Sequence, residues 1–485
     1  MRAKIGLLIL AALLCLMVCA CQATPDSAAV TSKNDGKLEA ALEMTAGKNA
    51  DDGQDSGLYT DSFTNTDGDI SYQVALDIPA IPGNMPALRV RPQTISADYA
   101  REVAEALFGD AEIYEYSQTW SKAELEELMR SLRQRMAELD TAEVYDSAIK
   151  EQLSEQLEAA LANYEAEYAA APETVESRLC SWDFHPHAWY YDQAWVNKDD
   201  PEYISASKSE WIVAASERDG IPYIYSVCNR EEEDYRMHSI TCEINWDLVA
   251  EDLILGTQAP TETDMETARA EAEAMLEKMK LGAWVVDLCE MREIGTLDGR
   301  SKYEIVVTAC PVYNGVKVSH QQQLQSLRTD DAFASNYYYE EIVFQFSGGH
   351  LICFEYQSPL EVVDVVNENV AILSFAEAMD KCKGQLQMRI LKTEPYTSTD
   401  FYQATGKDVD VYQAELGLVR IRVKNNTTDF YLLPAYSFRA TYTLFDKKGT
   451  LVFDSEILER TGLGTKELVV INAVDGSIIN TELGY

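Results

Sequence analysis

Residues 180–195 hold the side chains of this sequence that are best suited to chemistry. Asp183, His185, His187 and Asp192 lie there among six aromatic residues. In an extended chain, side chains two positions apart point to the same side, so the two histidines could ligate one metal ion. Two other interpretations remain open: an exposed aromatic platform for a sugar or peptide, and plain packing. We favour packing, because buried aromatic side chains dominate the area of protein cores.

The rest of the sequence lacks the motifs of common reaction centres. It has no G-x-S-x-G nucleophile elbow, no H-E-x-x-H zinc helix, no P-loop, and no G-x-G-x-x-G that opens a helix after a strand. With 81 acidic residues, pairs of carboxylates arise at every spacing by chance. We therefore assign no catalytic, cofactor-binding or metal-ligating residue and expect no cofactor. An enzyme stays an open alternative, but a protein without catalytic activity is favoured.

The start of the chain predicts covalent chemistry of another kind, at Cys21. Arg2 and Lys4 form a short basic start, residues 5–18 are almost uninterrupted apolar, and the small residue Ala20 directly precedes Cys21. Such a run is shorter than the roughly 20 residues of a membrane-spanning helix and is typical of an export signal. We therefore expect cleavage before Cys21 and acyl chains such as palmitate on that residue. The protein would then be a lipoprotein, lipid-anchored on the extracytoplasmic face of the cell membrane.

The composition is strongly acidic. The chain carries 40 Lys and Arg against 81 Asp and Glu, a formal net charge of −41. Such a field repels nucleic acid and anionic lipid headgroups, so no nucleic-acid partner is expected. The expected partners are the membrane, through the N-terminal lipid, and a protein of the envelope.

Seven cysteines remain after the signal and the lipid-attachment residue are set aside. An odd number leaves at least one thiol unpaired, and no C-x-x-C occurs to suggest a zinc ribbon or a redox pair. The sequence leaves open whether any of them form disulfides. They are Cys180, Cys228, Cys242, Cys289, Cys310, Cys353 and Cys382.

Capping residues and apolar periodicity predict the helices. Ser96 and Thr261 each stand where a helix N-cap is expected, and Ser121 with Glu124 has the spacing of a capping box. Apolar residues at steps of three and four follow residue 124 and recur after residue 149, which predicts a helical hairpin. The predicted helices cover residues 96–108, 121–139, 149–168, 261–281 and 374–384.

Alternating apolar residues and Gly-containing turns predict the strands. Residues 70–78 alternate strictly, and Asp-Gly, Asn-Gly and Gly-Gly turns separate many of the later runs. Glu340 and Glu341 are expected on the wet face of a strand entry. The predicted strands cover residues 70–78, 211–214, 222–228, 240–246, 284–294, 302–313, 337–347, 350–356, 411–424, 436–445, 451–453 and 468–471.

The order of these elements predicts an α+β fold, in which antiparallel sheet modules each follow a helix and a helical hairpin lies nearer the N-terminus. Seven consecutive segments are expected. They are a signal peptide (1–21), a flexible tether (22–57), a strand and helix region (58–115), a helical hairpin (116–172), a β-rich region (176–258), an α+β module (261–372) and a second α+β module (373–485).

The last segment resembles a known type of module. Residues 468–480 place a strand before the turn at Asp475 and Gly476 and another strand after it, which is similar to the closing hairpin of PepSY-type modules. The resemblance implies a helix packed on a small antiparallel sheet, and modules of this type are associated with inhibiting peptidases or restraining membrane-bound sensors.

The whole chain also resembles an uncharacterised family of surface lipoproteins from gut clostridia. The likeness covers Cys21, residues 30–36, the helical hairpin and the ending. It implies a cellular location and an architecture but no activity.

The favoured function is a membrane-anchored extracytoplasmic lipoprotein that binds a protein partner or regulates an envelope protein. Two alternatives stay open. One is a solute-binding lipoprotein that feeds a transporter, and the other is an envelope hydrolase that acts through the stretch from Asp183 to Asp192.

Overall fold

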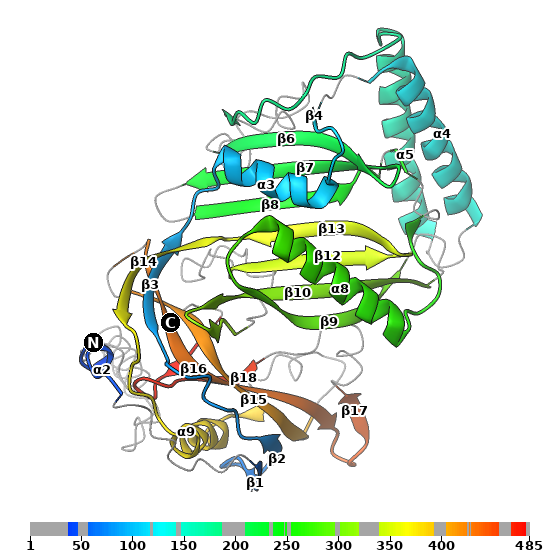
Figure 1. Cartoon of the computed structure of the whole chain (residues 1–485). Coiled ribbons are helices and arrows are strands. Elements are labelled where there is room, and N and C mark those ends of the chain that lie inside the picture. Colours follow the sequence, from blue (N-terminus) through cyan, green and yellow to red (C-terminus); the bar gives the residue numbers. More distant parts are fainter. Residues whose placement is uncertain are drawn as a thin grey trace, which may run out of the picture.

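The chain folds around two antiparallel-rich sheets, each covered by helices (Figure 1). The computed structural model describes residues 37–46, 57–116, 120–141, 147–186, 209–231, 236–246, 248–249, 254–295, 301–319, 339–391, 404–423, 426, 428–454 and 467–481. Within these residues, helices alternate with groups of antiparallel strands, and the predicted α+β fold class is confirmed.

Local capping chemistry fixes where several helices begin. The Ser96 side chain accepts a hydrogen bond from the Tyr99 backbone N–H, and Thr261 and Ser374 each form a complete capping box with the acidic residue three positions on. The helices are α2 (Lys37–Leu42), α3 (Ala97–Phe108), α4 (Lys122–Thr141), α5 (Ser147–Tyr168), α8 (Glu262–Met279) and α9 (Phe375–Gln387).

The middle of the chain forms a ten-stranded sheet. Its strands follow the order β11-β10-β12-β13-β8-β7-β6-β4, with β9 also paired to β10 and β5 to β6. They are β4 (Tyr114–Glu115), β5 (His185–Pro186), β6 (Ser209–Arg218), β7 (Ile221–Glu231), β8 (Arg236–Ile244), β9 (Trp284–Gly295), β10 (Ser301–Tyr313), β11 (Val316–Lys317), β12 (Glu341–Ser347) and β13 (His350–Gln357).

The two ends of the chain together form a nine-stranded sheet. Its main order is β1-β2-β15-β16-β18-β19, while β3 pairs with β14 and β16, and β17 pairs with β16. The strands are β1 (Leu58–Thr64), β2 (Ile70–Asp77), β3 (Ala87–Pro92), β14 (Leu360–Asn367), β15 (Gly406–Arg422), β16 (Phe430–Phe445), β17 (Leu451–Asp454), β18 (Glu467–Asn472) and β19 (Ile478–Ile479).

This second sheet joins parts of the sequence that are far apart. Strand β2 runs parallel to β15, with Ile70 beside Lys407 and Val74 beside Val411, and β3 lies between β14 and β16. Residues 58–115 and 373–485 are separate segments in the predicted order, whereas several of their strands share one sheet in the structure. The closing hairpin of β18 and β19 is part of the same sheet.

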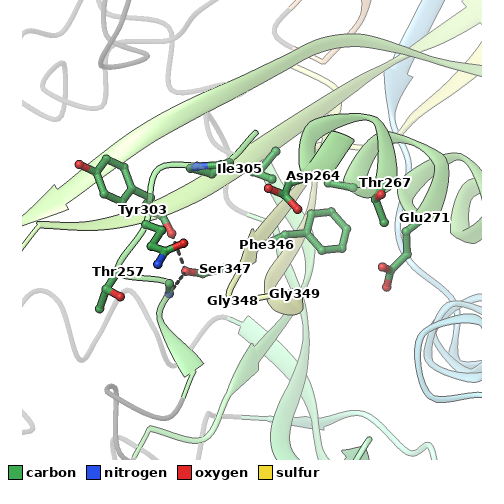
Figure 2. A pocket seen from close by; sticks show the side chains of 14 residues that line it. Thr257, Asp264, Thr267, Glu271, Tyr303, Ile305, Phe346, Ser347, Gly348 and Gly349 are labelled. Atoms are coloured by element: carbon green, nitrogen blue, oxygen red, sulfur yellow. Dashed lines mark hydrogen bonds between the residues drawn. The ribbon is translucent and has the colours of Figure 1, made fainter. Parts of the chain in front are cut away.

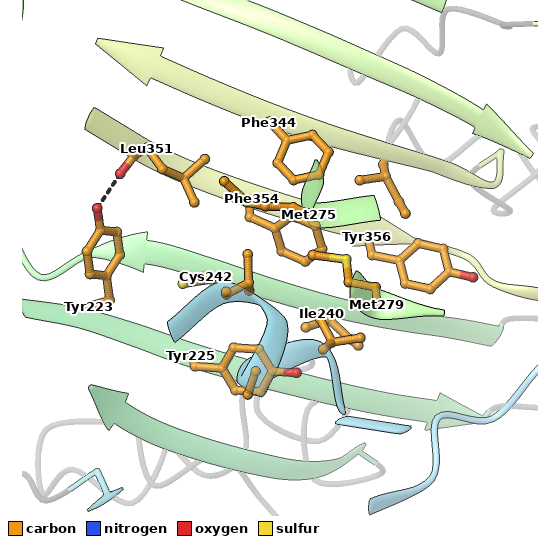
Figure 3. Close-up of a cluster of buried hydrophobic side chains, with 14 of the residues drawn as sticks. Tyr223, Tyr225, Ile240, Cys242, Met275, Met279, Phe344, Leu351, Phe354 and Tyr356 are labelled. Carbon is orange, nitrogen blue, oxygen red and sulfur yellow. Dashed lines mark hydrogen bonds between the residues drawn. The ribbon is translucent and has the colours of Figure 1, made fainter. Parts of the chain in front are cut away.

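The larger core lies between the ten-stranded sheet and the helices α3 and α8, which cover one face of it (Figure 1). Met275 and Met279 of α8 pack among aromatic side chains of the sheet, including Phe354 (Figure 3). The hydroxyl of the buried Tyr225 donates a 2.6 Å hydrogen bond to the Ala100 carbonyl of α3. Burial of such aromatic and sulfur-containing side chains is the main stabilising term of this half.

Two smaller cores cover the two faces of the nine-stranded sheet. Under α9, Phe375 packs against Tyr436 and Phe438 of β16. The opposite face carries a separate cluster to which Leu42 of α2 contributes. The central strands are therefore buried on both faces, which explains the continuous apolar run within β16.

A short segment after β10 ties the two sheets together. The Lys317 ammonium contacts the carboxylate of Asp287, in the ten-stranded sheet, and lies 2.7 Å from the Glu415 carboxylate, in the nine-stranded sheet. The Ser319 backbone N–H donates a 2.9 Å hydrogen bond to the Leu418 carbonyl of β15. The two sheets are thus joined by ion pairs and by main-chain contact.

Helices α4 and α5 pack against each other as a hairpin that stands at one side of the molecule (Figure 1). Arg133 of α4 pairs with Glu165 of α5 at 2.9 Å. Near the base of the hairpin, the Tyr168 hydroxyl donates a 2.5 Å hydrogen bond to the Glu126 carboxylate. These contacts are exposed and modest in energy, and the buried stripe of α4 that includes Leu125 and Leu128 supplies the packing.

Replacing Gly417 by alanine should destabilise the protein, because a Cβ atom there would stand 2.3 Å from the Ser319 Oγ and 2.9 Å from the Lys317 carbonyl oxygen. Relief of this overlap requires the joining segment to move off β15, and we expect a loss of about 1 to 3 kcal/mol in the free energy of unfolding. Urea denaturation measures it.

The matched control is Gly384→Ala in α9, where a Cβ meets nothing within 4 Å. Alanine is favoured over glycine in a helix interior, so this variant should be neutral or more stable by up to about 1 kcal/mol. Equal stability of the Gly417→Ala variant and the parent would contradict the proposed close approach.

Candidate functional site

A cavity of about 380 Å³ lies where α8, residues 256–260 and the turn between β12 and β13 meet (Figure 2). Its lining combines apolar side chains with two carboxylates and several glycines. The lining residues are Gly256, Thr257, Gln258, Pro260, Asp264, Thr267, Ala268, Glu271, Tyr303, Ile305, Phe346, Ser347, Gly348 and Gly349.

The polar side chains on the α8 wall of this cavity serve the helix itself. The Asp264 carboxylate accepts hydrogen bonds from the backbone N–H and the hydroxyl of Thr261, at 2.8 and 2.7 Å. These bonds hold the pKa of Asp264 below its usual value. The Thr267 hydroxyl donates to the Thr263 carbonyl at 2.8 Å. Neither side chain is set up for acid or base catalysis.

The opposite wall is held together by Ser347. Its hydroxyl donates to the Tyr303 carbonyl at 2.5 Å and accepts from the Gly256 backbone N–H at 2.9 Å. Gly348 is required beside it, because a Cβ there would lie 2.1 Å from the Ile254 carbonyl oxygen and its φ is +56°. Ser347 therefore shapes the wall, and no histidine lines the cavity to activate it as a nucleophile.

The second carboxylate of the cavity, Glu271, is paired with Arg218 of β6. Ile305 and Phe346 add apolar side chains to the lining. Such a cavity could hold a small apolar group, but both of its carboxylates and the Ser347 hydroxyl are engaged in internal contacts.

A second unusual place is the buried carboxylate of Glu340, just before β12. It was expected on a wet face, and this expectation is wrong, because Glu340 is only 7% exposed. Its oxygens accept hydrogen bonds from the hydroxyls of Tyr313 (2.7 Å) and Tyr356 (3.1 Å) and from the Leu360 backbone N–H (3.1 Å). Leu360 is the first residue of β14, so Glu340 fixes the place where the chain crosses into the nine-stranded sheet.

Burial raises the pKa of Glu340 to about 7, although the three hydrogen bonds and the nearby Arg420 oppose the rise. Burial and the neighbouring Glu340 carboxylate also raise the pKa of the Tyr313 and Tyr356 hydroxyls. Burial also raises the pKa of Glu341 and of Glu467 to about 7. Strongly shifted groups of this kind occur in active sites and in structural networks alike, and the three internal hydrogen bonds of Glu340 fit a structural network.

The third place is the free edge of β14. Among the described residues, β14 pairs only with β3. Its four valines, Val362, Val363, Val365 and Val366, are 36% to 43% exposed. Exposed apolar residues gathered along the unpaired edge of a strand are typical of protein-binding edges.

The residues that the sequence singled out for chemistry are only partly described. His185 is exposed and lies in β5, where it pairs with Trp211 of β6, and the Trp182 ring packs edge-on against Tyr225 at 6.2 Å. His187 lies outside the described residues, as do Asp192 and the rest of that stretch. The described half therefore fits the packing interpretation. Among the residues that the structure describes, no three His, Cys, Asp or Glu side chains are placed to hold a metal ion.

The lipid-attachment residue Cys21 also lies outside the described residues. No helix in the described ranges is both long and apolar enough to cross a membrane. The seven later cysteines are all free thiols. Burial raises the pKa of each of them, for example to about 12 for Cys228 and Cys382, so these thiols are poor nucleophiles at neutral pH.

Sequence reasoning missed both Glu340 and the β14 edge. Nothing in the residues around Glu340 distinguishes it from the exposed acids of the chain. The strand had a weak signal, because the two valine pairs in residues 360–367 have high β propensity.

Comparisons with known protein families and with curated proteins find no match. Among solved structures, the chain is similar to an uncharacterized protein from Eubacterium rectale ATCC 33656, with 11% identity and a TM-score of 0.36. The similarity covers 92% of this chain and 98% of that one.

Stability should fall when the pH is raised from 5 to 8. The pKa of Glu340 is raised from 4.5 to about 7 on folding, so its contribution is complete below pH 4.5 and is lost as the pH rises through 7. At about 1.4 kcal/mol per pKa unit, this carboxyl accounts for at most about 3 kcal/mol. Urea unfolding at both pH values measures the difference.

The variant Glu340→Gln should reduce this pH dependence, since the amide keeps the shape but cannot ionise. The exposed Glu361→Gln should leave it unchanged. A Glu340→Gln protein with the same loss of stability between pH 5 and pH 8 as the parent would refute the assignment.

Proposed function

We propose that this protein is an acyl-anchored extracytoplasmic module that binds another protein of the cell envelope. The anchor is Cys21, and the binding place is the free edge of β14. The proposal combines the export signal of the sequence with one structural observation, an apolar strand edge that no described strand covers.

The free edge of β14 supports the proposal because its chemistry suits a polypeptide partner. An extended segment can satisfy the free main-chain groups of an edge strand and cover its apolar side chains at the same time. Val362 is 43% and Val365 42% exposed, so each has apolar area left to bury. A small solute could use the side chains but would leave the main chain unpaired.

A solute-binding function has one observation in its favour, the cavity beside α8. Two observations count against it. The two carboxylates and the Ser347 hydroxyl of the cavity are engaged internally, and the described strand pairs are antiparallel except for β2 with β15 and the bridge of Val318 with Leu418. Binding proteins built from two α/β lobes have parallel sheets.

The lipid anchor at Cys21 is tested by metabolic labelling with an alkyne-tagged palmitate in cells that export the protein. The parent chain should be labelled and should sediment with membranes, and Cys21→Ser should lose both properties. The matched control Cys19→Ser removes a thiol two residues earlier and should behave as the parent. Label that persists in the Cys21→Ser variant would exclude this anchor.

Binding is tested by a photo-crosslinking amino acid placed at Val365 in the full-length lipoprotein, in its own membrane. We expect a discrete crosslinked band. The control position is Leu451 of β17, which is 55% exposed at another edge of the same sheet and should give no such band. The same products at both positions would show that the β14 edge has no special role.

A further inference from the structure

The β14 edge presents two chemically different faces. Val362 lies beside Val90 of β3, and Val365 lies beside Leu88 of β3. Val90 and Leu88 are both buried in the core under α9. The apolar layer of the nine-stranded sheet therefore continues without a break from the core to the edge, where it meets solvent. A further strand with apolar side chains on this face would extend the layer.

The opposite face of β14 is acidic. Glu361 pairs with Arg91 across the ladder at 3.0 Å. Asp364 lies opposite Arg89, but the Arg89 Nε donates instead to Asp429 at 2.7 Å. Asp364 is exposed and has no ion pair among the described residues. A strand that adds to the free edge of β14 would therefore lie beside a carboxylate without an ion-pair partner on this face.

The whole chain adds to this local charge. With a net charge of −41, the protein attracts cationic segments and repels acidic ones, including a second copy of itself. A basic segment that pairs with Asp364 would gain both the long-range attraction and a direct contact.

Two register shifts limit the length of any added strand. The pairing of β14 with β3 shifts at Val363 and again at Val366, and each shift bends the strand locally. A regular ladder on the free edge can therefore extend over only a few residues before or after the shift at Val363. Such interruptions are a common protection against unlimited edge-to-edge assembly.

The position of the edge relative to the anchor indicates where the partner lies. The Asn367 side chain at the end of β14 donates to the Leu42 carbonyl of α2 at 2.9 Å. Only 15 residues separate Lys37, the first of α2, from Cys21, and they reach at most about 55 Å when fully extended. In an anchored protein this reach limits how far α2, and with it the end of β14, can lie from the membrane surface.

We propose that the β14 edge binds a short extended segment of a membrane protein, with β-branched side chains on one face and Lys or Arg on the other. This inference rests on the proposed function and adds the chemistry of the partner. The apolar side chains cover Val362 and Val365, and a basic side chain pairs with Asp364.

The test uses the full-length lipoprotein in detergent and three fluorescent eight-residue peptides, followed by fluorescence anisotropy at 0.15 M salt. One peptide alternates valine with lysine, the second alternates valine with glutamate, and the third is the lysine peptide with proline at two valine positions. The first should bind at least tenfold more tightly than the other two. Equal binding of the lysine and proline peptides would reveal charge attraction alone and would overturn the proposal.

Reversing one charge tests the site directly. The variant Asp364→Lys should weaken binding of the lysine peptide about tenfold and improve binding of the glutamate peptide. The matched control Asp410→Lys, at an exposed position of β15, makes the same change in net charge and should alter neither by more than twofold. Equal effects of the two variants would also overturn the proposal.

Two further outcomes separate this inference from the proposed function. A crosslinked band at Val365 without any preference for the lysine peptide would overturn the partner chemistry and leave protein binding intact. Sedimentation of the chain as a dimer that the double variant Val362→Lys, Val365→Lys converts to a monomer would assign the edge to a second copy and overturn the membrane-protein partner.

Discussion

One lysine shared by two carboxylates holds the two sheets of this protein in their relative position. Lys317 is partly buried, which by itself lowers its pKa, but Glu415 and Asp287 outweigh this effect and raise it, so the ammonium stays charged. The two acids come from different sheets. Without the lysine, the two carboxylates would be like charges that are partly removed from water. Loss of the lysine should therefore destabilise the fold by more than the intact ion pairs stabilise it.

The other features of the junction depend on this contact. Gly417 allows the main chain of residues 317–319 to approach β15, and the bridge between Val318 and Leu418 follows from that approach. Glu340 then fixes the Leu360 N–H where β14 begins. The position of the β14 edge, which we propose as a binding place, therefore depends on the polar contacts of Lys317 and Glu340.

Local chemistry allowed many elements to be predicted from the sequence. Thr261 begins α8 because its side chain accepts from the helix N-terminus, and the Asn314 and Gly315 turn works because both residues adopt positive φ. β14 was not predicted, since its valine pairs do not alternate with polar residues. The two register shifts in its ladder explain why they do not.

Two properties could not be read from the sequence, because they arise from contacts between distant residues. The arrangement of β2 beside β15 joins positions more than 300 residues apart, and no local pattern encodes it. The burial of Glu340 depends likewise on Tyr313, Tyr356 and Leu360 meeting around it. Of residues 180–195, which hold the side chains best suited to chemistry, the described part contributes Trp182 and Phe184 to packing, as an aromatic-rich segment generally does.

The use of strands from both ends of the described chain in one sheet has a consequence for how the protein folds. The strands β1 to β3 emerge first, but their neighbours β14, β15 and β16 follow only after residue 360. The ten-stranded sheet is contiguous in sequence and can form in the meantime. Ile95 bonds to Asn229 and Ser358 bonds to His238 on neighbouring strands of that sheet. These contacts lie next to the pair of Pro92 with Leu360 and shorten the loop that the last strands must close. The middle of the chain thus acts as the template on which its two ends meet.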